Sequence, residues 1–565
     1  MIEKGRFNFE GGLFEYDSVG VRYIYLKSMR ENETEEVVIN ICGPLVVDAI
    51  SRNSLNMGWG RVLHWRDEDD NEHTLAIPMS MLQGDGRVIR EILADGGLKL
   101  GLDSKKKYLL LGYISNFPVN KRVICTSRTG WNDNSYVFVN GCIGEKVIYQ
   151  GDITDPIVSR NGRIEDWINN VSKLCEGNSR LVFSVALSLT GPVLAKINYE
   201  SFGVNLFGRS SIGKTTSAKV ATSVFGCPSN MRSWLTTSNG IEATALEHCD
   251  LFLSLDELGQ ADPIQISKSA YLLANGSGKS RANLTGKSKE LNKWRLTFLS
   301  TGEVTLSDIK IQNGMKVNVG EEVRLLDIPA DAGVGMGLFE DTHGLDSCKF
   351  SDELIFNVNR YYGSVGYEWI GCLVKNHQMI SEINDLANQY MTYFNKDDID
   401  SSAHKRVSKH FCLVAAIGEV ATSQGFTGWK VGASLQAAMA CYYAWHENFG
   451  TGIKEEKNIV QAIRKFIEYY GSTKFELYPN TTGMKVLDRV GYKKIASDGS
   501  ERYLVNDESL QSMAGCSNIK LIRDALVNAS LLVTGGDGRL VRKERLPGTN
   551  KIERINVISL KVEGL

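Results

Sequence analysis

The chain has 565 residues, of which 64 are lysine or arginine and 66 are aspartate or glutamate, giving a formal net charge of -2. With 42% hydrophobic and 23% charged residues, the composition is typical of a folded globular protein and excludes a disordered, fibrous or coiled-coil chain. The balanced charge also excludes a protein that is basic over its whole surface, so any polyanion must be bound by local clusters.

The cysteines and the apolar stretches indicate the cellular compartment of the protein. The 11 cysteines are scattered without a CxxC pair, which excludes a zinc-ribbon or redox motif and predicts reduced thiols. MIEKGRFNFE lacks the apolar centre of a signal peptide, and serine, threonine, glycine and proline interrupt the most apolar stretch, residues 181–197. We therefore expect a cytoplasmic protein without a membrane span.

Changes of pattern along the chain predict several domains. Short alternating strands run from about residue 37 to residue 142, and an acidic tip at 67–70 joins two of them as a solvated hairpin loop rather than a metal site. Strands then alternate with helical stretches to about residue 328, and helices predominate from 350 to 450. The predicted division is a mostly β N-terminal domain at 1–165, an α/β core at 166–345, a helical lid at 346–455 and a winged-helix-like domain at 456–565.

The strongest motif is GRSSIGKT, which matches G-x-x-x-x-G-K-[ST] between a predicted strand at 204–207 and a predicted helix at 216–224. In this motif backbone N–H groups curl around a β-phosphate, the lysine (Lys214) reaches the β- and γ-phosphates, and the hydroxyl (Thr215) ligates Mg²⁺. The predicted phosphate-binding residues are Gly208, Arg209, Ser210, Ser211, Ile212, Gly213, Lys214, Thr215 and Thr216.

An apolar run that ends in two acids, LFLSLDE at 251–257, supplies the second strand that such a site requires. We predict that Asp256 holds the magnesium-bound water shell and that Glu257 orients and polarises the attacking water. An acid pair of this kind favours a water nucleophile, and therefore hydrolysis rather than transfer to a hydroxyl group.

Two later strands carry further candidates. The strand predicted at 294–299 ends in Ser300-Thr301, where Thr301, or Ser300, is a candidate sensor of the γ-phosphate, unless the strand simply ends in hydroxyls. The strand predicted at 322–328 begins near Arg324, which is either a surface arginine or a finger that a neighbouring subunit supplies to the phosphates.

Taken in order, GRSSIGKT, LSLDELGQ, FLSTGE and EVRLLDIPAD resemble the P-loop core of an AAA+ ATPase. With WGRVLHW and RVSKHFCLVAAIGEVATSQGFTGW included, residues from about 43 to 429 resemble a mobile-element family formerly of unknown function. That family includes the cassette-chromosome (Cch) self-loading helicases and is similar to minichromosome maintenance helicases. The resemblance implies an AAA+ core with a helical lid, a hexameric ring around DNA, and ATP with Mg²⁺. It also implies that Arg324 is the arginine finger and that Arg406 is the second sensor arginine.

Two departures from the family pattern matter. The sensor strand ends in Ser-Thr where many AAA+ proteins have asparagine. No segment matches a primase or a zinc-binding N-terminal module, so priming must belong to another protein, and we expect partners encoded by the same element.

A basic segment lies between the acidic strand and the sensor strand. Over 17 residues, from 279 to 295, six basic side chains accompany a single acid, Glu290. They are Lys279, Arg281, Lys287, Lys289, Lys293 and Arg295. The resemblance implies a hairpin that enters the ring channel, and Lys279, Arg281, Lys287 and Lys289 are the predicted contacts to DNA phosphates. The alternative is a solvated basic face.

Near the C-terminus a predicted helix, SNIKLIRDALVNASLL, precedes a predicted two-strand wing. Helix followed by basic hairpin is the winged-helix arrangement, and the basic residues available for DNA backbone are Arg539, Arg542, Lys543 and Arg545. The alternative is a structural or protein-docking module.

The sequence therefore predicts an ATP-dependent DNA helicase or translocase that forms a hexameric ring and acts in replication of a mobile element. Two alternatives remain. One is an ATP-switched DNA-binding initiator or loader without unwinding activity. The other is an AAA+ remodeller of proteins, which predicts no stimulation by DNA.

Overall fold

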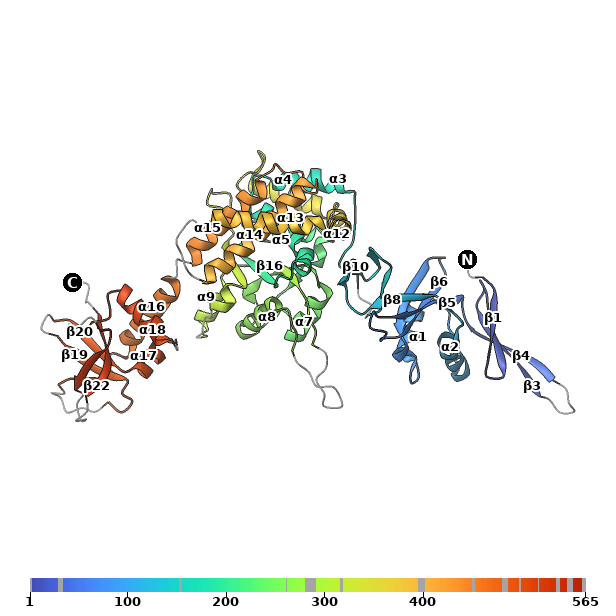
Figure 1. The fold of residues 1–565 in the computed structure, drawn as a ribbon, viewed down its shortest axis with the longest axis horizontal. Helices are drawn as coiled ribbons and strands as arrows, with labels where there is room; N and C mark the ends of the chain where they lie inside the picture. The colour runs from blue at the N-terminus through green and yellow to red at the C-terminus, as the bar shows by residue number, and fades with distance from the viewer. Residues whose placement is uncertain are drawn as a thin grey trace. The chain divides into compact units, whose positions relative to one another are not determined.

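The protein is described from a computed structural model (Figure 1). The described residues are 3–28, 34–151, 155–260, 262–279, 291–313, 315, 319–394, 402–449, 453–479, 486–496, 499–516, 518–534, 539–545 and 552–560. The chain divides into two compact units. The first unit comprises residues 1–310, 319–394 and 406–442, and the second comprises 311–318, 395–405 and 443–565. The four predicted domains and the three boundaries between them stay a prediction.

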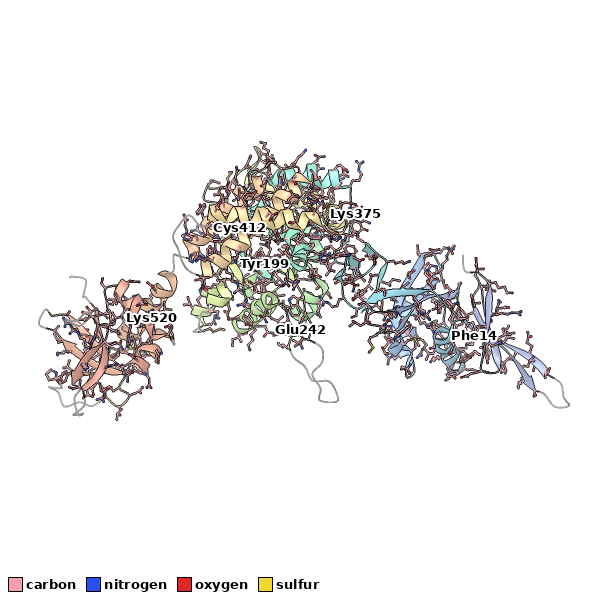
Figure 2. The ribbon with its side chains drawn as sticks, in the orientation of Figure 1. Phe14, Tyr199, Glu242, Lys375, Cys412 and Lys520 are labelled. Atoms are coloured by element: carbon pink, nitrogen blue, oxygen red, sulfur yellow. The ribbon has the colours of Figure 1, made fainter. Side chains whose placement is uncertain are left out.

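The N-terminal part of the first unit is rich in β-sheet, as the alternating pattern predicted. One antiparallel sheet has the order β1 (Gly5–Phe9), β2 (Gly12–Tyr16), β3 (Val21–Ser28) and β4 (Thr34–Cys42). A mixed sheet has the order β12 (Val147–Tyr149), β8 (Arg122–Thr126), β5 (Leu45–Arg52), β6 (Gly60–Arg66) and β7 (Glu72–Pro78). A 3-10 turn (Met79–Leu82) and helices α1 (Arg87–Asp95) and α2 (Ser104–Asn116) follow β7. Both sheets and both helices share one apolar core, which includes Phe14 (Figure 2).

The acidic tip between β6 and β7 forms a hairpin loop, as predicted. The carboxylate of Asp67 accepts the backbone N–H groups of Asp69 at 3.0 Å and Asn71 at 2.9 Å and lies 2.9 Å from His73 Nε2. These hydrogen bonds, led by that of His73, hold the pKa of Asp67 below its usual range. Asp67 therefore organises the turn.

A three-stranded sheet, β11 (Gly141–Ile143), β10 (Ser135–Phe138) and β9 (Gly130–Asn132), packs on the α/β core that follows it in the chain. The buried carboxylate of Asp250 accepts the backbone N–H of Trp131 at 3.0 Å, and the indole N–H of Trp131 donates to the carbonyl of Pro192 at 2.7 Å. Lys196 Nζ lies 3.8 Å from the centroid of the Trp131 ring system. Trp131 therefore joins the N-terminal part to the core.

The core is a parallel five-stranded sheet with the order β14 (Arg232–Ser233), β15 (Leu251–Asp256), β16 (Leu296–Gly302), β13 (Phe202–Phe207) and β17 (Leu325–Pro329). Apolar runs such as FGVNLF are buried because helices cover both faces of such a sheet. Strand β16 lies between the strand that precedes the P-loop and the acid-tipped strand. All three therefore end at one edge of the sheet.

Helices surround this sheet. Around it lie α3 (Ile164–Trp167), a π-helical turn (Ile168–Ser172), α4 (Lys173–Cys175), α5 (Ser179–Lys196), α6 (Lys214–Thr222), a 3-10 turn (Pro228–Asn230), α7 (Ser238–Glu247), a 3-10 turn (Leu258–Gln260), α8 (Pro263–Asn275), α9 (Leu306–Gln312) and α10 (Val319–Glu322). Helix α5 is buried along almost its whole length. None of the helices in the described residues has the length and hydropathy needed to cross a bilayer.

The helix-rich region follows the sheet, as the periodicity predicted. Its helices are α11 (Ser347–Val358), α12 (Ser364–Lys375), α13 (Gln378–Phe394), α14 (Ser402–Ser423) and α15 (Ala433–Phe449). Phe411 of α14 packs against Phe183 of α5, with ring centroids 5.3 Å apart. The helical region thus rests on the helix that also covers the sheet.

The second unit has its own core. Its helices are α16 (Ile453–Tyr470), α17 (Asp507–Ala514) and α18 (Ile519–Asn528), and its sheet has the order β18 (Phe475–Leu477), β19 (Gly491–Ile495), β20 (Glu501–Val505), β22 (Ile552–Leu560) and β21 (Arg542–Arg545). The predicted helix and the predicted hairpin near the C-terminus are both present, as α18 and the antiparallel pair β21–β22. Three further strands, β18, β19 and β20, widen the sheet beyond the predicted wing.

Candidate functional site

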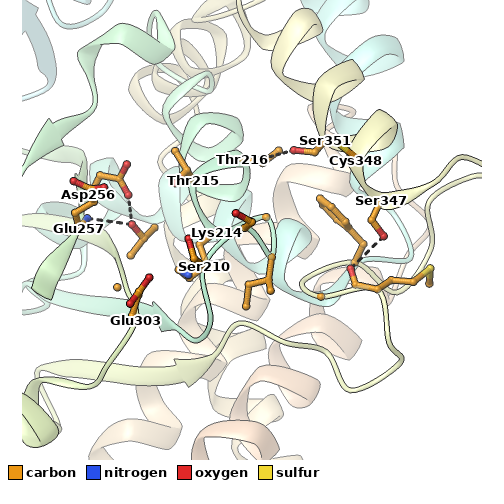
Figure 3. Close-up of a pocket in the computed structure, with 18 of the residues that line it drawn as sticks. Ser210, Lys214, Thr215, Thr216, Asp256, Glu257, Glu303, Ser347, Cys348 and Ser351 are labelled. Atoms are coloured by element: carbon orange, nitrogen blue, oxygen red, sulfur yellow. Dashed lines mark hydrogen bonds between the residues drawn. The ribbon is translucent and has the colours of Figure 1, made fainter.

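A cavity of about 860 Å³ lies at the carboxyl edge of the parallel sheet (Figure 3). Segments from five parts of the first unit line it. The first segment is residues 210–216, and the second contains Asp256, Glu257, Gly259 and Gln260. The third is residues 301–304, and the fourth is residues 335–337 together with Phe339. The fifth contains Ser347, Cys348, Ser351 and Asp352. In Figure 3 the acid pair lies on one side of Lys214, and Ser347, Cys348 and Ser351 lie on the other.

The P-loop leaves β13 and turns directly into α6. Gly208, Ser211 and Gly213 have φ angles of 151°, 61° and 100°, and Gly213 caps α6, which begins two residues earlier than predicted, at Lys214. A Cβ on Gly208 would lie 3.0 Å from Ile212 Cδ1, and one on Gly213 would lie 3.0 Å from the ring of Phe339. Both positions therefore require glycine, and the loop has the curled form that phosphate-binding loops use.

Lys214 lies at the centre of the cavity. Its Nζ donates to the carbonyl oxygens of Gly208 at 2.8 Å and Arg209 at 2.5 Å, so these two residues orient the lysine rather than line the cavity. Burial lowers the pKa of Lys214, and the carboxylates of Glu303 and Asp256 oppose this effect.

One of the two candidate sensor hydroxyls contacts the acid pair, and the other does not. The hydroxyl of Thr301 donates to the carboxylate of Asp256 and accepts the backbone N–H of Glu257 at 3.4 Å. Ser300 instead accepts the indole N–H of Trp234 at 3.0 Å in the buried core. Both hydroxyls lie within β16, which starts and ends later than predicted, and Thr301 is the one that lines the cavity.

Glu257 has a left-handed backbone, with φ 63°. A non-glycine residue in this region is uncommon and is typical of functional sites. This conformation ends β15 at Asp256, one residue earlier than predicted.

Sequence reasoning missed part of the lining. Glu303 follows the sensor strand and places a third carboxylate beside Lys214 (Figure 3). The glycine-rich run GVGMG at 333–337 and the start of α11 form the opposite wall, where Thr216 Oγ1 lies 2.6 Å from Ser351 Oγ. Two features of the sequence could have indicated this part of the lining: the glutamate that ends STGE, and the closely spaced glycines of GVGMG. Neither feature belongs to a known phosphate-binding motif.

Arg324 and Arg406 do not line this cavity. Arg324 precedes β17, because residues 319–322 form the helical turn α10 where a strand was predicted. It donates to the carbonyl of Gly320 at 2.8 Å. Arg406 lies within α14, not at its start, and pairs with both oxygens of Glu200, at 2.8 Å for the first. Glu200 lies just before the start of β13, whereas the P-loop lies just after the end of that strand. Both arginines therefore lie toward the edge of the sheet opposite the cavity.

The predicted DNA contacts are only partly described. Lys279 is exposed, whereas Arg281, Lys287 and Lys289 lie outside the described residues. The flanking residues form an antiparallel stem, with Ser277 bridged to Lys293 and the backbone N–H of Gly278 donating to Asn292 O at 2.8 Å.

Two of the other basic residues form hydrogen bonds within the protein. Arg295 donates to the carbonyl of Ala195 at 3.2 Å and to Asn198 Oδ1 at 2.6 Å. In the second unit Arg542 donates to the carbonyl of Thr534 at 2.8 Å. Arg539 and Lys543 are described, and the side chain of Arg545 lies outside the described residues.

The residues of the cavity fit a magnesium–nucleoside triphosphate. The curled loop can surround phosphates, the hydroxyl of Thr215 and the carboxylate of Asp256 face one space, and oxygen donors of this kind suit Mg²⁺. The cavity is also large enough for a nucleotide.

Comparisons with known proteins agree with the fold described above. A solved structure described as "SCCmec type IV Cch - active helicase" aligns with a TM-score of 0.66 and 15% identity over 99% of this chain and 98% of that chain, which shows a shared fold. Another, described as "The A form apo structure of NrS-1 C terminal region-CTR", aligns with a TM-score of 0.30 and 9% identity over 91% of this chain and 96% of that chain. A TM-score this low does not indicate a shared fold. A comparison with curated proteins found no match. Residues 14–293 match the family described as "Domain of unknown function (DUF927)", and the chain belongs to this family.

Proposed function

We propose that this protein is an ATP-dependent DNA helicase or translocase. One observation carries the proposal: the P-loop lysine, the acid pair and a sensor hydroxyl converge in one cavity at the carboxyl edge of a parallel sheet. P-loop ATPases have many activities. The description of the Cch structure as an active helicase supports helicase activity among them, because the two chains share a fold.

We assign roles in hydrolysis to Lys214, Thr215, Asp256, Glu257 and Thr301. Lys214 and the N–H groups of the P-loop bind the β- and γ-phosphates, and Thr215 and Asp256 hold Mg²⁺, which supplies positive charge to the phosphates when bound. Glu257 orients and polarises the attacking water. Thr301 reports the γ-phosphate to both acids, because its hydroxyl contacts the Asp256 carboxylate and the Glu257 backbone.

We also propose a ring assembly, and the position of Arg324 supports it. It does not line the cavity of its own chain, so it can stabilise the transferred phosphoryl group only in a neighbouring subunit. We propose a hexamer in which each site is completed by Arg324 of the next subunit. Arg406, which the family resemblance assigns as the second sensor, would likewise act only after leaving Glu200 or from a neighbour.

DNA would pass through this ring. We propose Lys279, Arg281, Lys287 and Lys289 as its phosphate contacts, and the antiparallel pairing of Ser277 with Lys293 supports a hairpin at this point in the chain. The second unit, with helices before a two-stranded hairpin, is proposed as a winged-helix-like module. The biological setting would be replication of a mobile element in the cytoplasm.

The test compares ATPase and strand-displacement activity of the wild type with those of Lys214→Ala and Glu257→Gln. Lys219→Ala, on the same helix, and Glu353→Gln, an exposed acid on α11, are the matched controls. We expect both site variants to lose both activities and both controls to keep them. Persistent activity in the site variants would overturn the assignment, and DNA-stimulated hydrolysis without strand separation would favour an initiator or loader.

A further inference from the structure

The segment from 330 to 341, here named the strap, connects β17 to α11 along one wall of the cavity. Gly333, Gly335 and Gly337 all have left-handed backbones, with φ of 84°, 84° and 67°. A backbone hydrogen bond from Ala332 N–H to Gly337 O at 2.8 Å closes the glycine-rich part. Because glycines lose the most conformational freedom on ordering, such a segment needs fixed points at its ends.

The strap touches the P-loop immediately before Lys214. The backbone N–H of Leu338 donates to the carbonyl of Ile212 at 2.8 Å, and a Cβ on Gly337 would lie 2.8 Å from that same oxygen. The ring of Phe339 packs beside Gly213. The position of the strap therefore decides the position of the two residues that lead into the phosphate-binding lysine.

Arg180, the second residue of α5, holds the first end of the strap. Its Nε donates to Pro329 O at 3.2 Å and its Nη2 donates to Asp331 O at 3.3 Å. Its Nη1 donates to Ser179 Oγ at 2.9 Å. The guanidinium is almost completely buried, so these carbonyl bonds replace the water that the charge has lost.

Asn178 holds the other end. Its Oδ1 accepts the backbone N–H groups of Glu340 at 2.8 Å and Asp341 at 3.1 Å, and its Nδ2 donates to Asp341 O at 2.8 Å. The carboxylate of Glu340 in turn accepts the Ser179 hydroxyl at 2.8 Å. Both ends of the strap are therefore fixed by three consecutive residues at the N-terminus of one buried helix.

We propose that Arg180 and Asn178 are positioning residues for nucleotide binding. They act through the strap, which keeps Ile212 and Gly213 in the phosphate-binding curve and keeps Met336 in the cavity wall. The inference rests on the proposed function, because it requires that the P-loop binds a nucleotide. It differs from a purely structural role in predicting an effect on nucleotide affinity that is larger than the effect on turnover.

The first experiment measures the dissociation constant and the dissociation rate of a fluorescent ATP analogue, with KM and kcat for ATP, in Arg180→Met and Asn178→Ala. The controls are Arg61→Met, which removes an arginine bonded to Ser115 O, and Asn357→Ala, which removes a buried asparagine bonded to Asn170 O at 2.9 Å. We expect the strap variants to raise Kd and KM at least about fivefold, with kcat at saturation retained within about twofold. Arg180→Lys should restore part of the affinity.

The second experiment avoids the buried residues, whose substitution can reduce folding. Gly335 in the strap and Gly344 beyond it are both exposed, with φ of 84° and 85°. Alanine at either position introduces the same backbone strain, but only Gly335→Ala changes the strap. We expect weaker nucleotide binding in Gly335→Ala and wild-type binding in Gly344→Ala.

Equal nucleotide affinity in Gly335→Ala and Gly344→Ala, or a fall in kcat without a rise in KM in the Arg180 and Asn178 variants, would overturn the proposal. A wild type that binds no nucleotide in the same assay would instead overturn the proposed function. The two failures are therefore distinguishable.

Discussion

The hydroxyl of Thr301 donates a hydrogen bond to the carboxylate of Asp256, although 44 residues separate them in the sequence. The bond exists because β16 lies beside β15 in the sheet, with both strands ending at the cavity. The hydroxyl of Thr301, the proposed sensor, therefore contacts the proposed metal-binding acid directly and the backbone of Glu257 as well.

Substitution of the two adjacent hydroxyls should separate catalysis from stability. Thr301→Ala should lower kcat by about tenfold or more with little change in the melting temperature, because it removes the contact to both acids. Ser300→Ala should keep kcat but cost about 1–3 kcal/mol of unfolding free energy, because the buried indole N–H of Trp234 loses its acceptor. Steady-state kinetics and thermal unfolding of the two variants check this, and the reverse pattern would contradict the sensor assignment.

Arg324→Ala should bind nucleotide with wild-type affinity and lose turnover by about a thousandfold, which is the size of effect expected of an arginine finger. Mixing it with Lys214→Ala protein should restore ATPase activity, because mixed neighbours contain one complete site. Arg360→Ala is the matched control, since this exposed arginine lies 5.1 Å from the Phe356 ring on α11. An unrecovered mixture would argue against action between subunits.

Asp250 should respond oppositely to two substitutions. Burial raises the pKa of this carboxyl, against the lowering effects of the Trp131 N–H and of Arg128 and Arg295. Asp250→Asn keeps the acceptor for Trp131 and tolerates the left-handed backbone, φ 55°, so stability at neutral pH should be unchanged or higher. Asp250→Ala should cost about 1–3 kcal/mol because the N–H is orphaned.

The pH dependence of Asp250 has a defined sign. Its folded pKa exceeds the unfolded value of about 4, so its contribution to stability is present below that value and is lost as pH rises through the folded pKa. Asp250→Asn should remove this loss. Denaturant unfolding at a series of pH values measures it, and an identical pH profile for the wild type and Asp250→Asn would contradict the burial argument.

His410 should make the first unit sensitive to acid. Burial lowers its pKa to about 3, with a smaller contribution from the charge of Arg406. Its ring stacks on Phe202 at 4.2 Å, and its Nδ1 lies 3.0 Å from the hydroxyl of Tyr199. Because the folded pKa is depressed, stability is present above the unfolded pKa of about 6.5 and falls by up to about 1.4 kcal/mol per pH unit as pH drops toward the folded value.

His410→Phe, which cannot be protonated, should lose stability at neutral pH but show a shallower decline between pH 6.5 and 4. Thermal unfolding across this range checks the prediction. A residual slope is expected from His248, whose pKa burial lowers to about 4. An unchanged slope in His410→Phe would show that other groups control the acid response.

The sequence by itself determined the P-loop turn and the acid-tipped strand. GRSSIGKT and LSLDE are contiguous, and each residue in them is set by its near neighbours, so spacing alone predicts their geometry. The alternating strands of the N-terminal part and the periodic helices were predictable for the same reason, because the pattern of burial along one element is a local property. Boundaries were less secure, and α10 forms where a strand was predicted because the ion pair between Lys310 and Glu321 and the bond from Ser307 to Glu322 fix a helical turn.

Only the tertiary structure decided the rest of the site. The choice of Thr301 over Ser300 depends on which partners lie on the two faces of the sheet, because adjacent side chains of β16 point to opposite faces. The pairing of Arg406 with Glu200 joins residues 206 positions apart. The strap is the strongest case: nothing in GVGMG specifies a shape, and its position comes from Arg180 and Asn178 on a distant helix. Contacts of this kind are absent from local patterns because burial and hydrogen-bond partners are set by packing between segments, which a linear sequence does not display.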